Sequence, residues 1–319
     1  MSLYGSVIPS DAQGGHTFRN RFINGDFRVW QRGTSFSSIG TSTYSADRWV
    51  SNYGGTAPTF TRSTDVPTGF KYSISLAGSS TSFHGILQRI ESLNTADLSG
   101  QTVTLSFYAK LSSGTATNGL SINIAYANSV DDFSSTTSVL ETSITSTVSG
   151  SWTRYSYTFT VTSNMAANGF HVVVFNPSAT QTFTMLLTGM QLERGSVATP
   201  FEFRPYATEL QLCQRYFHSL GGDTAYQSIN TCVYYSTTEA VGFFRHPVEM
   251  RGIPTISKSG NWTVLGGSGS VGQNVSADQV GPKTVQFGFY SGASGVSGQA
   301  TTLRVNNDLN FRLTFSAEL

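Results

Sequence analysis

Alternation of apolar and polar residues, repeated along most of the chain, is the strongest structural signal in the sequence. Val103–Lys110 reads VTLSFYAK and Leu120–Tyr126 reads LSINIAY, so every second side chain is apolar. Trp152–Val161 repeats this alternation, and Phe170–Phe175, FHVVVF, is a continuous apolar run that suits a central strand covered on both faces. Gly, Ser and Asn residues separate these runs, which is typical of a β-sandwich or jelly roll.

A helical periodicity is clearest at Ala207–Phe217, which reads ATELQLCQRYF. Thr208 can cap the start, and the stretch predicts a helix of about three turns. Its apolar stripe could line a threefold axis between copies of the chain, or it could cover a sheet of the same chain. We favour the axis, and the stripe is then the candidate oligomer interface: Leu210, Cys213, Gln214 and Phe217.

The order of these elements predicts an all-β protein of two β-sandwich (jelly-roll-like) modules joined by one short α-helix. The length of 319 residues fits two such modules. We expect an N-terminal anchoring arm at 1–22, a jelly roll at 23–205, a linker helix at 206–219 and a C-terminal β-sandwich head at 220–319.

Charge and hydropathy exclude several classes of protein. Only 12% of the residues are charged and the net charge is +1, whereas a nucleic-acid-binding protein usually carries a basic stripe. No apolar run approaches the roughly 20 residues that span a bilayer, so we expect no membrane insertion. Residues 1–15 lack the basic and apolar regions of a signal peptide. We therefore expect synthesis in a cytoplasm and release by another route, such as particle assembly and lysis.

The chemistry-bearing residues form few recognisable sites. The five histidines have no metal-like spacing, and Cys213 and Cys232 are interpreted as thiols of a reducing compartment, although sequence cannot exclude a disulfide. Asp131 and Asp132 are the metal candidates, because adjacent loop carboxylates suit calcium, but a solvated loop is the favoured interpretation. Five acidic residues are candidates for glycosidase carboxylates, but none lies in a catalytic motif: Asp47, Glu91, Asp97, Glu141 and Glu193. The sequence therefore predicts no enzyme and no required cofactor.

Sugar binding needs flat aromatic rings beside polar groups. Trp30, Trp49 and Trp152 lie inside strand-like motifs, where core packing is the better interpretation. Gly/Ser-rich loops at 266–272 and 291–298 could carry binding, as loops on rigid scaffolds often do. The glycan-binding candidates are Trp262, Tyr53, Tyr126 and Tyr290.

Several ordered motifs resemble those of phage structural proteins. Phe22–Gly33 reads FINGDFRVWQRG and Tyr44–Trp49 reads YSADRW. Residues 188–203 contain QLERGSVATPF, and Phe244–Ile256 reads FRHPVEMRGIPTI. Together with ELQLCQRY at 209–216 and the final Ala-Glu-Leu, this set resembles tailed-phage tail-fibre-like or virion structural proteins with a carbohydrate-binding-module-like β-sandwich.

The resemblance implies a virion protein without catalytic activity that assembles as a homotrimer. As a short tail fibre or receptor-binding component it would adsorb to the host. It would need no cofactor, and a structural calcium ion is the one candidate. Its partners would be other tail or capsid proteins, held through residues 1–22, and a host surface glycan. The alternative is a capsid-surface decoration or head-fibre protein anchored by the same arm. A glycan-degrading tailspike and a secreted carbohydrate-binding module are less favoured.

Overall fold

The computed structural model describes residues 18–80, 82–177, 181–264 and 275–290 together with 295–319. The chain forms two units. The first contains the chain up to Phe27, Ser35–Thr43 and Val50–Pro205; the second contains Arg28–Thr34, Tyr44–Trp49 and Tyr206–Leu319. Within the described residues, no helix is long and apolar enough to cross a membrane.

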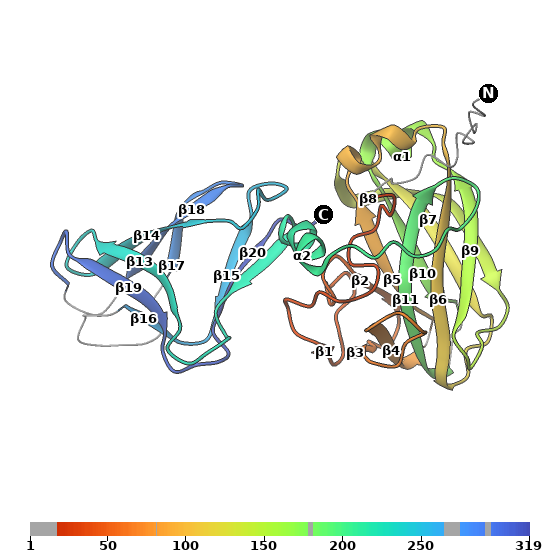
Figure 1. Cartoon of the computed structure of the whole chain (residues 1–319), viewed down its shortest axis with the longest axis horizontal. Coiled ribbons are helices and arrows are strands. Elements are labelled where there is room, and N and C mark those ends of the chain that lie inside the picture. The colour runs from red at the N-terminus through yellow and green to blue at the C-terminus, as the bar shows by residue number, and fades with distance from the viewer. Residues whose placement is uncertain (1–17, 81, 178–180, 265–274, 291–294) are drawn as a thin grey trace, which may run out of the picture. The chain divides into compact units, whose positions relative to one another are not determined.

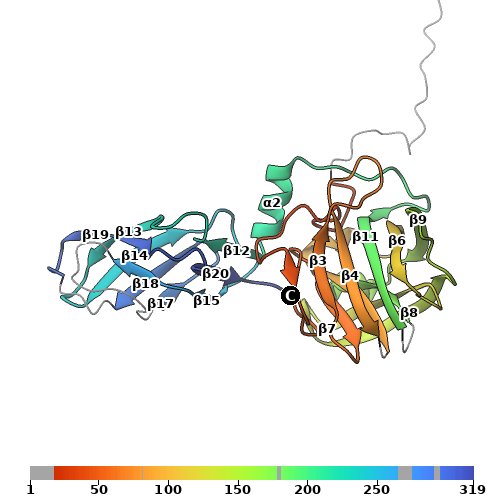
Figure 2. The same cartoon turned by 90° about the horizontal axis from the view of Figure 1, so that it is seen from below.

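The first unit is a sandwich of two antiparallel sheets (Figure 1). Sheet A has six strands in the order β1 (Ser35–Phe36), β3 (Thr59–Ser63), β4 (Ser73–Ser80), β11 (Gln181–Arg194), β6 (Thr102–Gly114) and β9 (Thr153–Thr160). Figure 2 shows β3, β4, β11 and β6 following one another across this sheet.

Sheet B has five strands in the order β2 (Val50–Gly54), β5 (Phe83–Ile90), β10 (Phe170–Asn176), β7 (Leu120–Ser129) and β8 (Asp132–Thr145). The short helices η2 (Ser92–Asn94), η3 (Ala96–Leu98) and α1 (Ser163–Asn168) connect strands of this unit. The predicted alternation is confirmed, because Leu105 and Phe107 of β6 and Ile122 and Ile124 of β7 are fully buried. The apolar run at β10 lies in the middle of its sheet, as predicted.

The second unit also consists of antiparallel strands. Sheet C has the order β12 (Phe217–Leu220), β20 (Arg312–Ser316) and β15 (Thr255–Ser259). Sheet D has the order β16 (Trp262–Val264), β19 (Ala300–Val305), β13 (Ser228–Tyr234), β14 (Glu239–Arg245), β18 (Thr284–Tyr290) and β17 (Val275–Val280). The core of this unit includes Trp262, Phe287 and Phe315. The all-β class with β-sandwich modules is therefore confirmed.

The linker helix is shorter than the periodicity predicts. Helix α2 spans Tyr206–Gln214, and Phe217 begins β12, where it pairs with Ser316. The helical spacing of apolar residues continues past Gln214, but the backbone there gains strand hydrogen bonds with β20 instead. Tertiary pairing therefore overrides the local periodicity, and Phe217 is not a helical residue.

Two segments from the N-terminal third of the chain belong to the second unit, where they surround the carboxyl-terminal residues. The Glu318 carboxylate accepts hydrogen bonds from the guanidinium groups of Arg48 and, at 2.9 Å, Arg32. The Tyr44 hydroxyl donates to the Leu319 carbonyl at 3.0 Å. Burial raises the pKa of the neighbouring Asp47 carboxyl to about 6, although Arg32 opposes this shift. The phage-like motifs that carry these residues therefore close the second unit.

Candidate carbohydrate-binding groove

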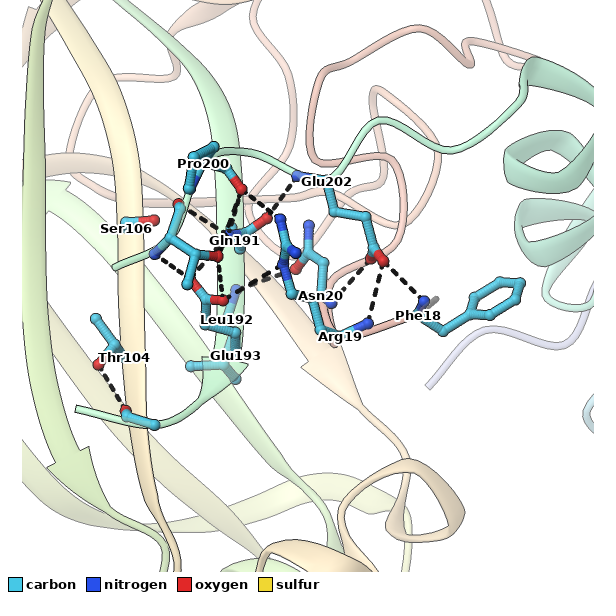
Figure 3. A network of polar contacts seen from close by, with 12 residues as sticks. Phe18, Arg19, Asn20, Thr104, Ser106, Gln191, Leu192, Glu193, Pro200 and Glu202 are labelled. Carbon is cyan, nitrogen blue, oxygen red and sulfur yellow. Dashed lines mark hydrogen bonds and ion pairs between the residues drawn. The ribbon is translucent and has the colours of Figure 1, made fainter. Parts of the chain in front are cut away.

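The outward face of sheet A is covered by the segment that follows β11 (Figure 3). Thr104 donates its hydroxyl hydrogen to the Gly195 carbonyl at 2.7 Å. The Glu193 carboxylate accepts from the backbone N–H and the hydroxyl of Thr199, at 2.8 and 2.6 Å. The hydrogen bonds of the motif QLERGSVATPF thus fix the segment 195–202, which we call the lid, against this sheet. Glu193 is therefore a structural carboxylate.

The start of the described chain is tied to the same lid. The Glu202 carboxylate accepts hydrogen bonds from three consecutive backbone N–H groups, those of Phe18, Arg19 and Asn20, at 2.8, 3.2 and 3.0 Å (Figure 3). Asn20 is 4% exposed and Phe22 is fully buried. These residues, which the sequence placed in the anchoring arm, therefore pack as part of the first unit, and residues 1–17 of the arm lie outside the described residues.

The outward face of sheet B holds a groove of about 270 Å³. Side chains alternate across a strand, so one set of positions on each of the five strands faces this side. The groove is lined by eight such residues: Asn52, Phe83, Leu87, Asn123, Glu141, His171, Val173 and Phe175.

The floor of the groove is apolar. Val173 of β10 lies directly opposite Leu87 of β5, and Phe175 lies opposite Gly85. A Cβ atom at position 85 would overlap the Cβ of Phe175. The glycine therefore allows Phe175 of β10 to pair with position 85 of β5. The Phe83 ring stands edge-on to the Phe175 ring, with 5.9 Å between their centroids. Such a floor suits the C–H face of a sugar ring, as apolar surfaces do in small-molecule sites.

Amide and carboxylate groups form the rim. The Asn123 side-chain amide donates to the Ser138 hydroxyl at 2.8 Å and to the Glu141 carboxylate at 3.2 Å. These bonds fix two polar groups on β7 and β8, and Asn52 supplies a second amide from β2 at the other side of the sheet. Amides and carboxylates offer the donors and acceptors that sugar hydroxyls need.

His171 lies near the start of β10, the central strand of sheet B. Burial and the nearby Arg89 cation lower its pKa to about 4, so the imidazole is neutral at physiological pH. Its ring stacks with Phe133 at a centroid distance of 6.0 Å. A neutral imidazole can donate through one nitrogen and accept through the other.

Neither of the two glycan platforms predicted in the first unit lines this groove. Tyr53 is opposite His84, on the other side of β2 from Asn52, and its ring meets that of His84 at 6.1 Å. The Tyr126 hydroxyl accepts a hydrogen bond from Asn164 of α1 at 3.4 Å.

The other two platforms belong to the second unit. Trp262 is 1% exposed in the core and has no ring face for a sugar. The side chain of Tyr290 lies outside the described residues, as do loop residues 266–272 and 291–294.

The carboxylates of the two metal candidates accept hydrogen bonds from neighbouring serine residues. The Asp131 carboxylate accepts from the Ser92 backbone N–H at 2.6 Å and from the Ser92 hydroxyl at 2.9 Å. The Asp132 carboxylate accepts from Ser134 N–H, and this bonding lowers its pKa. Across the described part of the chain, no group of three His, Cys, Asp or Glu residues could hold a metal ion.

Two of the four residues of the candidate oligomer interface are buried within the second unit. Cys213 is fully buried and Phe217 is 5% exposed, while the Arg32 guanidinium lies 3.5 Å from the Phe217 ring centroid. These two side chains are therefore not exposed for contact with another copy. They pack within their own chain, which is the second of the two alternatives that the periodicity left open. Leu210 and Gln214 are half-buried. Cys213 and Cys232 are both free and buried, and burial raises the pKa of each thiol.

Part of the first unit is similar in sequence to a known protein family. Residues 24–180 match the family of carbohydrate binding domains. All eight residues that line the groove fall inside this match. The groove therefore lies within the part of the first unit that is similar to carbohydrate binding domains.

Several solved structures are similar to part of this chain, at low sequence identity and low TM-scores. A protein of Bacteroides thetaiotaomicron proposed to bind sugars is 13% identical, covering 55% of this chain and 100% of its own, with a TM-score of 0.39. A xylan-binding domain of Paenibacillus barcinonensis is 15% identical, covering 46% and 92%, with a TM-score of 0.34. Tailspike protein 4 of bacteriophage CBA120 is 18% identical, covering 50% and 21%, with a TM-score of 0.35. No curated protein matches the sequence.

Proposed function

We propose that this chain is a non-enzymatic surface protein of a tailed-phage virion, a short tail fibre or receptor-binding component, whose groove on sheet B binds a host surface glycan. The observation that carries the sugar-binding part is the groove itself, which has an apolar floor and an amide and carboxylate rim within the part of the first unit that is similar to carbohydrate binding domains. The virion part rests on the ordered motifs that resemble phage structural proteins.

Binding without cleavage is the chemistry that this rim supports. Hydrolysis of a glycosidic bond generally uses two carboxyl groups about 5–10 Å apart. Among the eight lining residues, Glu141 is the single carboxylate. It is hydrogen-bonded to Asn123 at the exposed edge of the groove, where it can accept from a sugar hydroxyl.

Asn123→Ala tests the groove directly. The substitution removes an amide of the rim and releases Glu141 from its partner, so we expect affinity for glycan to fall by roughly tenfold or more, the loss of one good hydrogen bond. The full-length protein is first screened on an array of bacterial surface glycans, and the best ligand is then titrated by calorimetry.

Asn128→Ala is the matched control. Asn128 lies on the same strand and bonds to Ser135 and Thr137 of β8, but it does not line the groove. Its replacement should leave glycan affinity within about twofold. Equal losses in both variants, or no glycan bound by the unmodified protein, would remove the groove from the proposal.

A capsid-surface or head-fibre position is the second candidate. Three backbone bonds to Glu202 fix the point where the N-terminal arm joins the first unit, which suits attachment to either a tail or a capsid protein. Immunogold labelling of intact virions distinguishes the two, since gold at the tail tip supports adsorption and gold spread over the head supports decoration.

A further inference from the structure

The outward face of sheet D exposes apolar side chains at its centre. Strands β13 and β14 are the third and fourth of its six strands. Val233 is 48% exposed on β13, and Phe243 is 69% exposed on β14. Tyr235, which follows β13 on the same side, is 74% exposed. Large apolar side chains gathered on adjacent central strands mark an interaction surface more often than scattered single ones do.

The strand register places these side chains on one face. Cys232, Tyr234 and Ala240 belong to the core of the unit, so the alternate positions point outward. Val233 lies directly opposite Val241 in the register of β13 and β14. We call Val233, Tyr235, Val241 and Phe243 the sheet D stripe.

Polar residues flank the stripe. On β18, Gln286 lies beside Phe243, and on β19, Thr302 lies beside Thr231 of β13. An apolar centre with a polar rim is the usual anatomy of a protein–protein interface.

The charges on β14 indicate which partner fits. The outward residues of this strand are, in order, Glu239, Val241, Phe243 and Arg245. An acidic residue thus stands at one end and a basic residue at the other, about 20 Å apart along the strand. A second β14 laid antiparallel over the first would bring each Glu239 to the partner copy's arginine and would place the apolar residues between them.

We infer that the sheet D stripe is the contact surface for a second copy of this chain. The two copies pack sheet against sheet about a twofold axis near Gly242, with the sheets about 10 Å apart. In a twofold interface, a contact between one residue of the first copy and another residue of the second copy occurs a second time with the two copies exchanged. The ion pair between Glu239 and Arg245 therefore forms twice, once at each end of β14. This contact replaces the helix α2 stripe as the site of self-association.

Mass measurement by sedimentation velocity tests the inference on the full chain at concentrations up to about 100 µM. We expect a mass of two copies, and Phe243→Ser should raise the dissociation constant more than tenfold. The control is Ile253→Ser, because Ile253 is equally exposed, at 70%, but lies outside sheet D. A monomer at every concentration, or an unaltered dimer in Phe243→Ser, overturns the surface.

Charge reversal tests the twofold arrangement. Glu239→Arg and Arg245→Glu should each weaken the dimer at least tenfold, because like charges then face each other. The double variant should restore the dissociation constant to within about threefold, since the pairs re-form with their signs exchanged. Melting curves confirm that each variant is folded. Absence of rescue, or a mass of three copies, overturns the twofold pairing, and the latter result would instead support the trimer that the sequence resemblance implies.

Discussion

His171 shows how its surroundings set the chemistry of a single side chain in the groove. The sequence offers it as one of five scattered histidines, whereas the structure places it beside Arg89, Phe133 and the apolar floor. Burial there disfavours the charged imidazolium, and the Arg89 cation adds to this effect. The groove therefore presents a neutral imidazole ring near pH 7.

The lowered pKa of His171 predicts an acid-dependent loss of stability. Between its usual pKa of 6.5 and the folded value of about 4, the unfolded chain binds a proton that the folded chain does not. The folded state therefore loses stability as pH falls through this window, by about 3 kcal/mol in total. Urea unfolding from pH 7 to pH 4 measures the loss, which should be smaller by about this amount in His171→Gln. Parallel pH profiles for the two proteins would contradict the prediction.

Residue roles were the least predictable level. Aromatic residue type predicted the glycan platforms, but Tyr53 lies on the other side of β2 from the groove and Trp262 is buried. The lining residues Asn123 and His171 carried a usable signal, since each interrupts a strongly apolar strand with a polar residue. Which face of a strand remains exposed to solvent depends on the segments that pack against its sheet. The alternation of residues along one strand does not contain this information.

At the scale of elements, the pairing of β5 with β10 shapes the groove. Gly85 and Phe175 lie opposite each other, and the missing side chain leaves room for the backbone of β10 and for the ring. Strand alternation predicted strands of both sheets because apolar residues recur at every second position of β6 and β7, and these apolar side chains are buried. It could not predict the end of helix α2, where pairing with β20 converts Phe217 into a strand residue.

Gly85→Ala should therefore disturb the sheet as well as the floor of the groove. The added Cβ would overlap Phe175 and the Val174 carbonyl, so β5 and β10 must separate, at a cost of roughly 1–3 kcal/mol. Urea unfolding should show this loss and calorimetry should show weaker glycan binding. Gly252→Ala is the control, since a Cβ there meets nothing within 4 Å. Equal stability of the two variants would show that the strands tolerate the side chain.

At the scale of the whole molecule, residues 18–22 of the predicted N-terminal arm belong to the first unit. Residues 18–22 are held by Glu202 and by the burial of Asn20 and Phe22. The boundary predicted at residue 22 therefore cuts through packed structure, because polar composition alone does not reveal that a carboxylate far along the chain binds this backbone.

Deletion of residues 1–17 separates attachment from folding. We expect the shortened protein to melt at an unchanged temperature and to be missing from purified virions, because the packed residues remain. Deletion of residues 1–22 removes the buried Phe22 and should lower the melting temperature by several degrees, as loss of a core aromatic does. Calorimetry and immunoblots of virions measure the two effects. Incorporation of the 1–17 deletion at the normal level would end the anchoring proposal.

The ion pairs of Glu318 also have a consequence for synthesis on the ribosome. Arg48 and Glu318 are separated by 270 positions and Arg32 and Glu318 by 286. Translation at about 5–20 residues per second delays these contacts until long after the first arginine has emerged. The second unit can therefore complete these contacts only after Glu318 has been synthesised, and a chain that stopped before Glu318 would leave the buried Arg48 and the partly buried Arg32 without their shared carboxylate. Only copies translated to Glu318 can close that unit.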